Sequence, residues 1–173
     1  MKKFTLIGVL ILVLVIIGLA FVFLSNQNIK TSMFDTAKNQ TQEEVPQDIK
    51  ASFAIFTNGT FRIFTASMYH NLSEDVFIES SNPNVVNVKK AGISWGDFFE
   101  TLPMELSSQC LTTGTGQTFC SNGTQTLKFY INGEFDSDAL DREINEGDRL
   151  LVSYGNESDS QVTEQLQQIP TAE

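Results

Sequence analysis

The segment TLKFYING at residues 126–133 decides the fold class of this chain. Its aromatic and β-branched side chains are typical of a β-strand, and the closing Asn132-Gly133 readily takes the positive φ angles of a type I′ turn. A second signal of this kind follows, because Glu146-Gly147-Asp148 predicts a turn that feeds a last strand over Arg149–Tyr154. We therefore expect a β-sheet to organise this part of the chain.

Two further strand pairs are predicted upstream. Ser52–Thr57 and Thr60–Phe64 are β-prone and flank Asn58-Gly59, so they predict a hairpin with a tight turn. Val76–Glu79 and Val85–Val88 are short apolar runs separated by a turn that contains asparagine and proline. Both pairs add strands to the expected sheet.

One helix is predicted between these strands and the last ones. Ser94 is a capping residue, and Asp97 stands at the third helical position, where an acid suits both the cap and the helix dipole. Four apolar side chains then fall at helical spacing on one face: Trp95, Phe98, Phe99 and Leu102. Pro103 ends the helix, and Leu106–Leu111 is expected to return to strand. The order strand–strand–helix–strand–strand predicts an α+β domain.

The N-terminal part differs sharply from this domain in composition. The chain has 173 residues with 21 acidic and 11 basic side chains, yet residues 5–24 carry no charge. Twenty apolar residues form a helix of roughly 30 Å, the thickness of a lipid hydrocarbon core. Lys2 and Lys3 place residues 1–4 in the cytoplasm by the positive-inside rule. We expect a single-pass signal anchor in the cell membrane with the lipid bilayer as a partner; a cleaved signal peptide is the alternative.

The remaining chain divides into three parts. Residues 25–50 are polar and are interpreted as a linker, residues 51–155 as the extracytoplasmic domain, and residues 156–173 as a polar tail or short helix. Val162, Leu166 and Ile169 recur at helical spacing in the tail, so that helix either docks against the domain or frays in solvent. Beyond residue 24 the chain holds nine basic and 21 acidic residues, which argues against a nucleic acid as partner.

Cys110 and Cys120 are predicted to form a disulfide. An even pair of cysteines at this spacing outside the cytoplasm is most simply structural. The intervening polar segment Leu111–Phe119 is interpreted as an exposed loop closed by that bond. A redox-active cysteine pair and two free thiols are the alternatives, although redox-active cysteines usually stand in a C-x-x-C turn.

The densest charge cluster is acidic, with seven carboxylates in the segment Glu134–Asp148. Asp136, Asp138 and Asp141 suggest a weak calcium site, because hard cations prefer several carboxylate ligands. The EF-hand spacing is not met, since Leu140 stands where an oxygen ligand belongs. A solvated, charge-rich connection is the alternative interpretation.

The sequence offers no catalytic constellation. His70 is the one histidine, which leaves a zinc or copper site without companion ligands if the cysteines are paired. No nucleophile elbow and no phosphate-binding loop follows any predicted strand. We expect no catalytic residue, no transition-metal site and no cofactor.

Four segments resemble a group of uncharacterised exported, membrane-anchored archaeal and bacterial proteins. They are Gly92–Phe99, the Cys110 and Cys120 pair, Thr126–Gly133 and Glu146–Asn156. The closing pattern is similar to β-grasp domains such as the transcobalamin-like module, which implies a mixed sheet that wraps one main helix. Proteins of the group often carry H-x-H pairs near the domain start and before the helix, and neither stretch contains histidine here.

The N-terminus also resembles type IV pilins over residues 2–7, KKFTLI. Lys3 stands where those proteins have glycine, and Gly8 where they have glutamate. The function expected from all these features is a non-enzymatic binding or protein-interaction module at the envelope, with an unknown envelope protein or small ligand as its partner. Recognition would fall to Leu111–Phe119 and Glu134–Asp148. An envelope thiol, redox or metal-linked factor and a pilin-like filament subunit are the alternatives.

Overall fold

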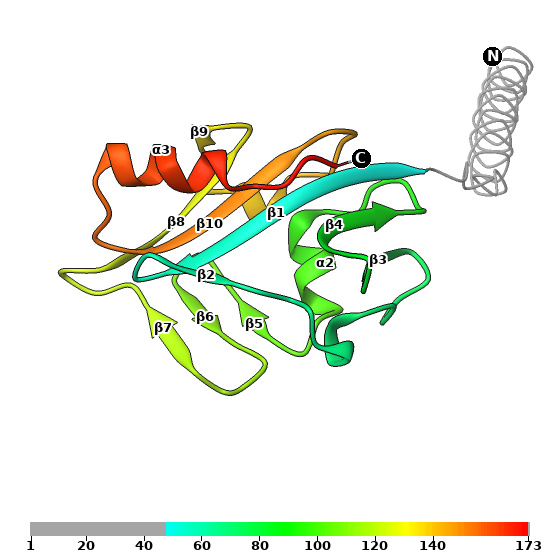
Figure 1. Ribbon diagram of the computed structural model, residues 1–173, viewed down its shortest axis with the longest axis horizontal. Helices are drawn as coiled ribbons and strands as arrows, with labels where there is room; N and C mark the ends of the chain where they lie inside the picture. The colour runs from blue at the N-terminus through cyan, green and yellow to red at the C-terminus, as the bar shows by residue number, and fades with distance from the viewer. Residues whose placement is uncertain (1–47, 173) are drawn as a thin grey trace, which may run out of the picture. The chain divides into compact units, whose positions relative to one another are not determined.

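A parallel pair of long strands lies at the centre of a mixed sheet in the computed structural model, which describes residues 48–172 (Figure 1). The strands of this sheet are β1 (Ile49–Thr57), β2 (Thr60–Arg62), β3 (Val76–Glu79), β4 (Asn82–Val88), β8 (Thr126–Ile131), β9 (Glu134–Phe135) and β10 (Arg149–Gly155). A smaller sheet contains β5 (Glu105–Leu106), β6 (Cys110–Thr112) and β7 (Thr118–Cys120). The α-helices are α2 (Trp95–Glu100) and α3 (Asp159–Gln167), and the short 3-10 helices are η1 (Ser67–Tyr69) and η2 (Ala139–Asp141).

The strand order of the main sheet is β3-β4-β1-β10-β8-β9. β1 and β10 run parallel, with Phe53 opposite Leu150, whereas β4 and β8 flank them in antiparallel pairs. β2 pairs antiparallel with the end of β1 at Ile55–Thr57, beyond the part of β1 that β4 covers. First and last strands of the domain therefore meet in the middle of the sheet.

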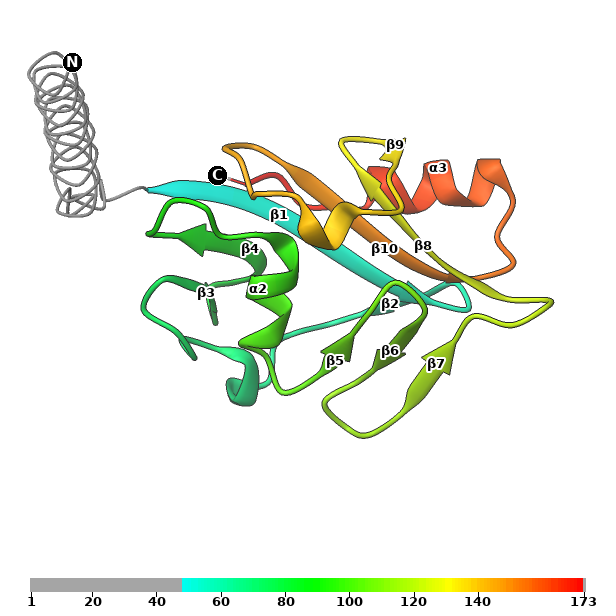
Figure 2. The ribbon, with the colours of Figure 1, turned by 180° about the vertical axis from the view of Figure 1, so that it is seen from behind.

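The two faces of the sheet are buried under different elements. Because side chains alternate along a strand, Phe53 and Ile55 of β1 enter the larger core, while Ala54 and Phe56 enter a smaller cluster. α2 and the β5–β7 sheet lie on the side of the larger core, and α3 lies on the opposite side (Figure 2). The result is a sheet covered on both faces.

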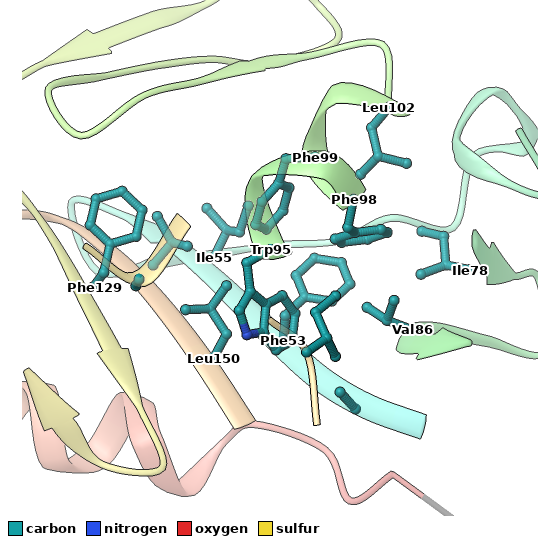
Figure 3. Packing of buried hydrophobic residues seen from close by; sticks show 14 of the residues in the cluster. Phe53, Ile55, Ile78, Val86, Trp95, Phe98, Phe99, Leu102, Phe129 and Leu150 are labelled. Carbon is teal, nitrogen blue, oxygen red and sulfur yellow. The ribbon is translucent and has the colours of Figure 1, made fainter. Parts of the chain in front are cut away.

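α2 begins as the sequence predicts. The Ser94 hydroxyl accepts a bond from the Asp97 backbone N–H at 3.1 Å, and the Ser94 N–H donates to the Asp97 carboxylate at 2.8 Å. This reciprocal cap satisfies backbone donors that would otherwise have no partner. The buried face of the helix packs on Phe53, whose ring meets those of Phe98 and Phe99 edge-on at centroid distances of 5.4 and 5.7 Å (Figure 3).

α3 is docked against the sheet, which decides between the two alternatives for the tail. Val162 and Ile169 are buried on the face that carries Phe56. The Arg149 guanidinium donates to the carbonyls of Leu166 and Ile169 at 3.1 and 2.9 Å. A cation at the C-terminal end of a helix satisfies free carbonyls and complements the helix dipole, so it fixes that end to β10.

Both predicted Asn-Gly turns are confirmed. Asn58 and Gly59 have φ angles of 51° and 73°, and Asn132 and Gly133 have 54° and 90°. The strand bounds differ at several places: β1 begins at Ile49 rather than Ser52, β2 ends at Arg62 rather than Phe64, β4 begins at Asn82, and β10 extends to Gly155. β4 includes Pro83, and its pairing with β3 shifts register between Ile78 and Glu79.

The prediction of one strand over Leu106–Leu111 is wrong. The segment forms two strands, β5 and β6, which are joined by a turn in which the Ser107 hydroxyl accepts a bond from the Cys110 N–H at 3.0 Å. The exposed-loop interpretation of Leu111–Phe119 is also wrong. β6 and β7 form a hairpin there, and Leu111 is 1% exposed within the larger core. The residues on the outward face of the hairpin are polar, so the composition of the segment does not reveal that its other face is buried.

The predicted membrane anchor lies outside the residues that the structure describes. Residues 5–24 are not among the described residues, so the predicted transmembrane helix stays a prediction. Within residues 48–172, no helix combines the length and apolar character needed to cross a bilayer.

Candidate functional site

A cavity of about 200 Å³ lies between the β1–β2 hairpin and the tip of the β6–β7 hairpin. Apolar residues of the larger core form much of its wall: Ile55, Phe64, Met104 and Leu111. Its rim includes Ile63, which is 66% exposed, and Thr115 at the hairpin tip. Concave, mostly apolar sites with a few polar groups are the usual form of small-ligand sites.

Arg62 is the one charged residue that lines this cavity. Its Nε donates to the hydroxyl of buried Thr57 at 2.6 Å, and its guanidinium lies 5.1 Å from the ring centre of Phe119. A further contact joins its Nη2 to Gln117 Oε1 at 3.5 Å. Within residues 48–172, no carboxylate forms an ion pair with this guanidinium.

Tight packing at Gly114 holds the hairpin tip against the cavity. A Cβ atom at this glycine would come within 2.5 Å of the Tyr69 hydroxyl and 2.8 Å of the Pro103 carbonyl oxygen. Tyr69 in turn meets the Phe64 ring edge-on at a centroid distance of 5.0 Å. Residue 114 must therefore be glycine for the tip to close over the cavity in this way.

The disulfide between Cys110 and Cys120 is present and lies at the open end of the same hairpin. The two cysteines face each other across β6 and β7, so the bond joins the strands that carry Leu111 and Phe119. Both residues contribute to the cavity region, Leu111 as wall and Phe119 beneath Arg62. The disulfide thus stabilises the hairpin that completes the cavity.

Charge is divided unequally over the domain. Residues 48–172 hold 17 acidic and seven basic side chains, yet neither 49–73 nor 106–133 contains a single acid. These two stretches supply most of the cavity, including Arg62. Although the domain as a whole is acidic, most of the cavity is therefore built from stretches that contain no aspartate or glutamate.

The acidic segment has a different arrangement. Asp136 accepts a bond from Arg142 Nε at 2.8 Å and another from the Asp138 backbone N–H at 2.8 Å. The Arg142 guanidinium and the Asp138 N–H hold the pKa of Asp136 below its ordinary value. Asp138 precedes η2 and Asp141 is its last residue, and the Asp141 N–H donates to the Asp138 carbonyl.

The structure does not bring the three predicted calcium ligands together. Across residues 48–172, no group of three histidine, cysteine or carboxylate side chains is placed to hold a metal ion. Asp136 is already engaged with Arg142, and Asp138 and Asp141 are exposed at the surface. This geometry is that of a solvated connection with one ion pair.

His70 is a half-buried residue after η1 rather than part of a reactive group. Its Nε2 lies 2.8 Å from the Phe64 carbonyl oxygen. This contact ties the segment after η1 to the end of the β1–β2 hairpin. The histidine thereby positions Phe64, which lines the cavity.

Comparison of the chain with protein-family models, curated proteins and solved structures found no match. The site must therefore be interpreted from its own residues. Arg62 was not singled out in the sequence, although one signal for it exists: it is flanked by Phe61, Ile63 and Phe64 in a long stretch without acids.

Proposed function

We propose that this protein is a non-enzymatic binding module with a β-grasp-like domain, displayed outside the cell by the membrane anchor predicted for residues 5–24. The observation that supports binding most directly is the cavity with Arg62 at its wall. An unpaired guanidinium beside apolar surface in a strongly acidic domain gives the molecule one region with distinct recognition chemistry.

The β-grasp assignment draws support from the connectivity. The sequence resemblance implies a mixed sheet that wraps one main helix. The sheet here is mixed, because β1 and β10 are parallel and have the antiparallel β4 and β8 as outer neighbours, and α2 packs on Phe53. β3 and the β5–β7 sheet are additions to this pattern, and the second of them forms part of the cavity.

Binding in the cavity is tested with a variant that fills it. Thr115→Trp places an indole at the rim and costs one hydroxyl contact to Thr113. Thr118→Trp is the matched control, because Thr118 is an exposed residue of the same hairpin, loses one hydroxyl contact to Thr112, and does not line the cavity. Both variants are compared with the wild type as full-length chains in detergent micelles.

The readout is the thermal shift caused by small apolar compounds with and without charge. A ligand at a hundred times its Kd raises the free energy of unfolding by about 2.7 kcal/mol. We expect compounds that stabilise the wild type and Thr118→Trp to leave Thr115→Trp unchanged. If no compound stabilises the wild type, or if Thr115→Trp responds as the wild type does, the cavity is not a binding site.

The anchor is tested separately. The full-length chain should remain in the membrane pellet after an alkaline carbonate wash, and external protease should digest the domain on intact cells. Removal of residues 5–24 should release the chain from the pellet. Recovery of the full-length chain in the wash would contradict an anchored module.

A further inference from the structure

The Arg62 guanidinium is held in place while its terminal nitrogens are left largely without partners. Thr57, which is 1% exposed, accepts from Nε, and the Phe119 ring lies beneath the guanidinium plane. The contact of Nη2 with Gln117 is long at 3.5 Å. A fixed guanidinium with free terminal N–H groups is suited to a planar acid group that accepts two parallel bonds.

The other arginines of the described part have different roles. Arg142 is paired with Asp136, and Arg149 donates to a carbonyl in the last turn of α3 and to one just after it. Arg62 differs from both because it is oriented by neutral partners and lines a cavity. Its terminal N–H groups are therefore available to an anion from outside the described domain.

The electrostatic surroundings favour an anionic ligand over a cationic one. The cavity lining contains no carboxylate, and the stretches 49–73 and 106–133 that supply most of it contain none in their sequence. A bound amine would meet Arg62 without an acid to compensate, whereas a carboxylate would find its counter-charge. The polar groups at the rim are hydroxyls such as those of Thr113 and Thr115.

The size of the cavity limits the body of the ligand. An apolar cavity of about 150 Å³ takes up one benzene molecule. The cavity here measures about 200 Å³, which leaves room for one ring and a short substituent. Its wall includes Ile55, Phe64 and Leu111, which matches an aromatic or branched aliphatic body of that size.

We infer that the cavity binds a small monocarboxylic acid with one ring-sized apolar body, and that Arg62 holds the carboxylate. This inference rests on the proposed function of the same cavity and adds the chemical class of its ligand. Arg62 acts as a binding residue, and Thr57 and Phe119 act as positioning residues for it.

The test compares an acid with its neutral isostere. Isothermal titration calorimetry is performed on the full-length chain in detergent micelles with phenylacetate and with phenylacetamide, and titrations into empty micelles are subtracted. Arg62→Gln removes the guanidinium at the cavity. Arg142→Gln is the matched control, because it removes the same charge from the acidic segment outside the cavity.

We expect the wild type and Arg142→Gln to bind phenylacetate at least about tenfold more tightly than phenylacetamide, the effect of charge-assisted hydrogen bonds on a dissociation constant. In Arg62→Gln this ratio should fall to about one, while phenylacetamide binds as in the wild type. Unchanged amide binding also shows that the variant is folded. Added salt should weaken binding of the acid and leave binding of the amide unaffected.

The two proposals fail in different ways. Equal binding of acid and amide to the wild type, with both blocked in Thr115→Trp, would overturn the carboxylate inference and leave the binding module intact. An acid preference that persists in Arg62→Gln would overturn the role of Arg62. Lack of binding by both compounds would contradict the inferred ligand, and the wider compound series then decides whether the cavity binds at all.

Discussion

Removal of the disulfide is expected to lower the free energy of unfolding by an amount that depends on the length of the loop it closes. The Cys110–Cys120 bond closes a segment of 11 residues, as its separation of ten positions gives. In the chain-entropy relation a loop of that length contributes about 2.8 kcal/mol to the free energy of unfolding. The double variant Cys110→Ser/Cys120→Ser removes this contribution without leaving a lone thiol.

The expected shift in melting temperature follows from the size of the described domain. Residues 48–172 comprise 125 residues. At about 2.1 cal/mol/K per residue, their unfolding entropy is about 260 cal/mol/K, so a loss of about 2.8 kcal/mol lowers Tm by about 11 °C. Differential scanning calorimetry of the full-length chain measures this shift directly.

A neighbouring cross-strand pair supplies the control. Thr112 and Thr118 face each other on the same two strands, so Thr112→Ser/Thr118→Ser changes the hairpin by two methyl groups and keeps the hydroxyl contact. Its Tm should stay within about 3 °C of the wild type. If Cys110→Ser/Cys120→Ser also stays within that range, the disulfide does not stabilise this hairpin and the reasoning is wrong.

Three further predictions concern the cap, the second helix and the hairpin tip. Asp97→Asn should lower the free energy of unfolding at neutral pH by about 0.5–1 kcal/mol in urea titrations, because bonds from Ser94 hold the Asp97 pKa below its ordinary value of 3.8. Arg149→Met should speed amide hydrogen exchange in α3 and spare β1, because charged bonds are lost at Leu166 in the last turn of that helix and at Ile169 just after it. Gly114→Ala should cost about 1–3 kcal/mol, since its Cβ would collide with a tyrosine hydroxyl and a backbone carbonyl; Gly123→Ala, with open space around it, is the control.

The pH dependence gives the Asp97 prediction a definite sign. A carboxyl whose pKa is lowered in the folded state adds stability that is complete above the ordinary value of 3.8 and is lost as pH falls through the folded pKa. The difference between wild type and Asp97→Asn should therefore shrink in acid. A constant difference across this range would show that the charge of Asp97 has no part in the cap.

Local sequence signals predicted the elements whose geometry is local. The turns at Asn58-Gly59 and Asn132-Gly133 were predictable because few residue pairs take positive φ at both positions. Ser94 and Asp97 were predictable as a cap because both partners lie within one helical turn. The buried face of α2 followed from the spacing of its aromatic residues.

The β6–β7 hairpin was missed because its inward face contains few residues. Leu111 is the one fully buried side chain of β6, and Thr112 and Thr118 on the outward side give the segment its polar composition. Docking of α3 was equally undecidable from sequence. It depends on Arg149, which belongs to β10 and reaches the helix end only after the chain has turned back.

The cavity could not be predicted because segments far apart in sequence form it. Ile55 lies in β1, Met104 follows α2, and Thr115 belongs to the hairpin tip. The position of Arg62 depends on Thr57 and Phe119, and Phe119 is brought near only by the β6–β7 fold. Sequence showed the long stretches without acids, but not that they surround a common site.

Methyl NMR on methionine tests the central claim, that this cavity is where the domain binds its ligand. The chain contains four methionines, of which Met104 lines the cavity and Met68 lies beside Gly114 at its edge. In the full-length chain with 13C-methyl methionine, an aromatic acid such as phenylacetate should shift the Met104 and Met68 methyl signals saturably, and it should not do so in Thr115→Trp. Methyl signals of Met104 and Met68 that stay unmoved while calorimetry shows saturated binding would contradict the account.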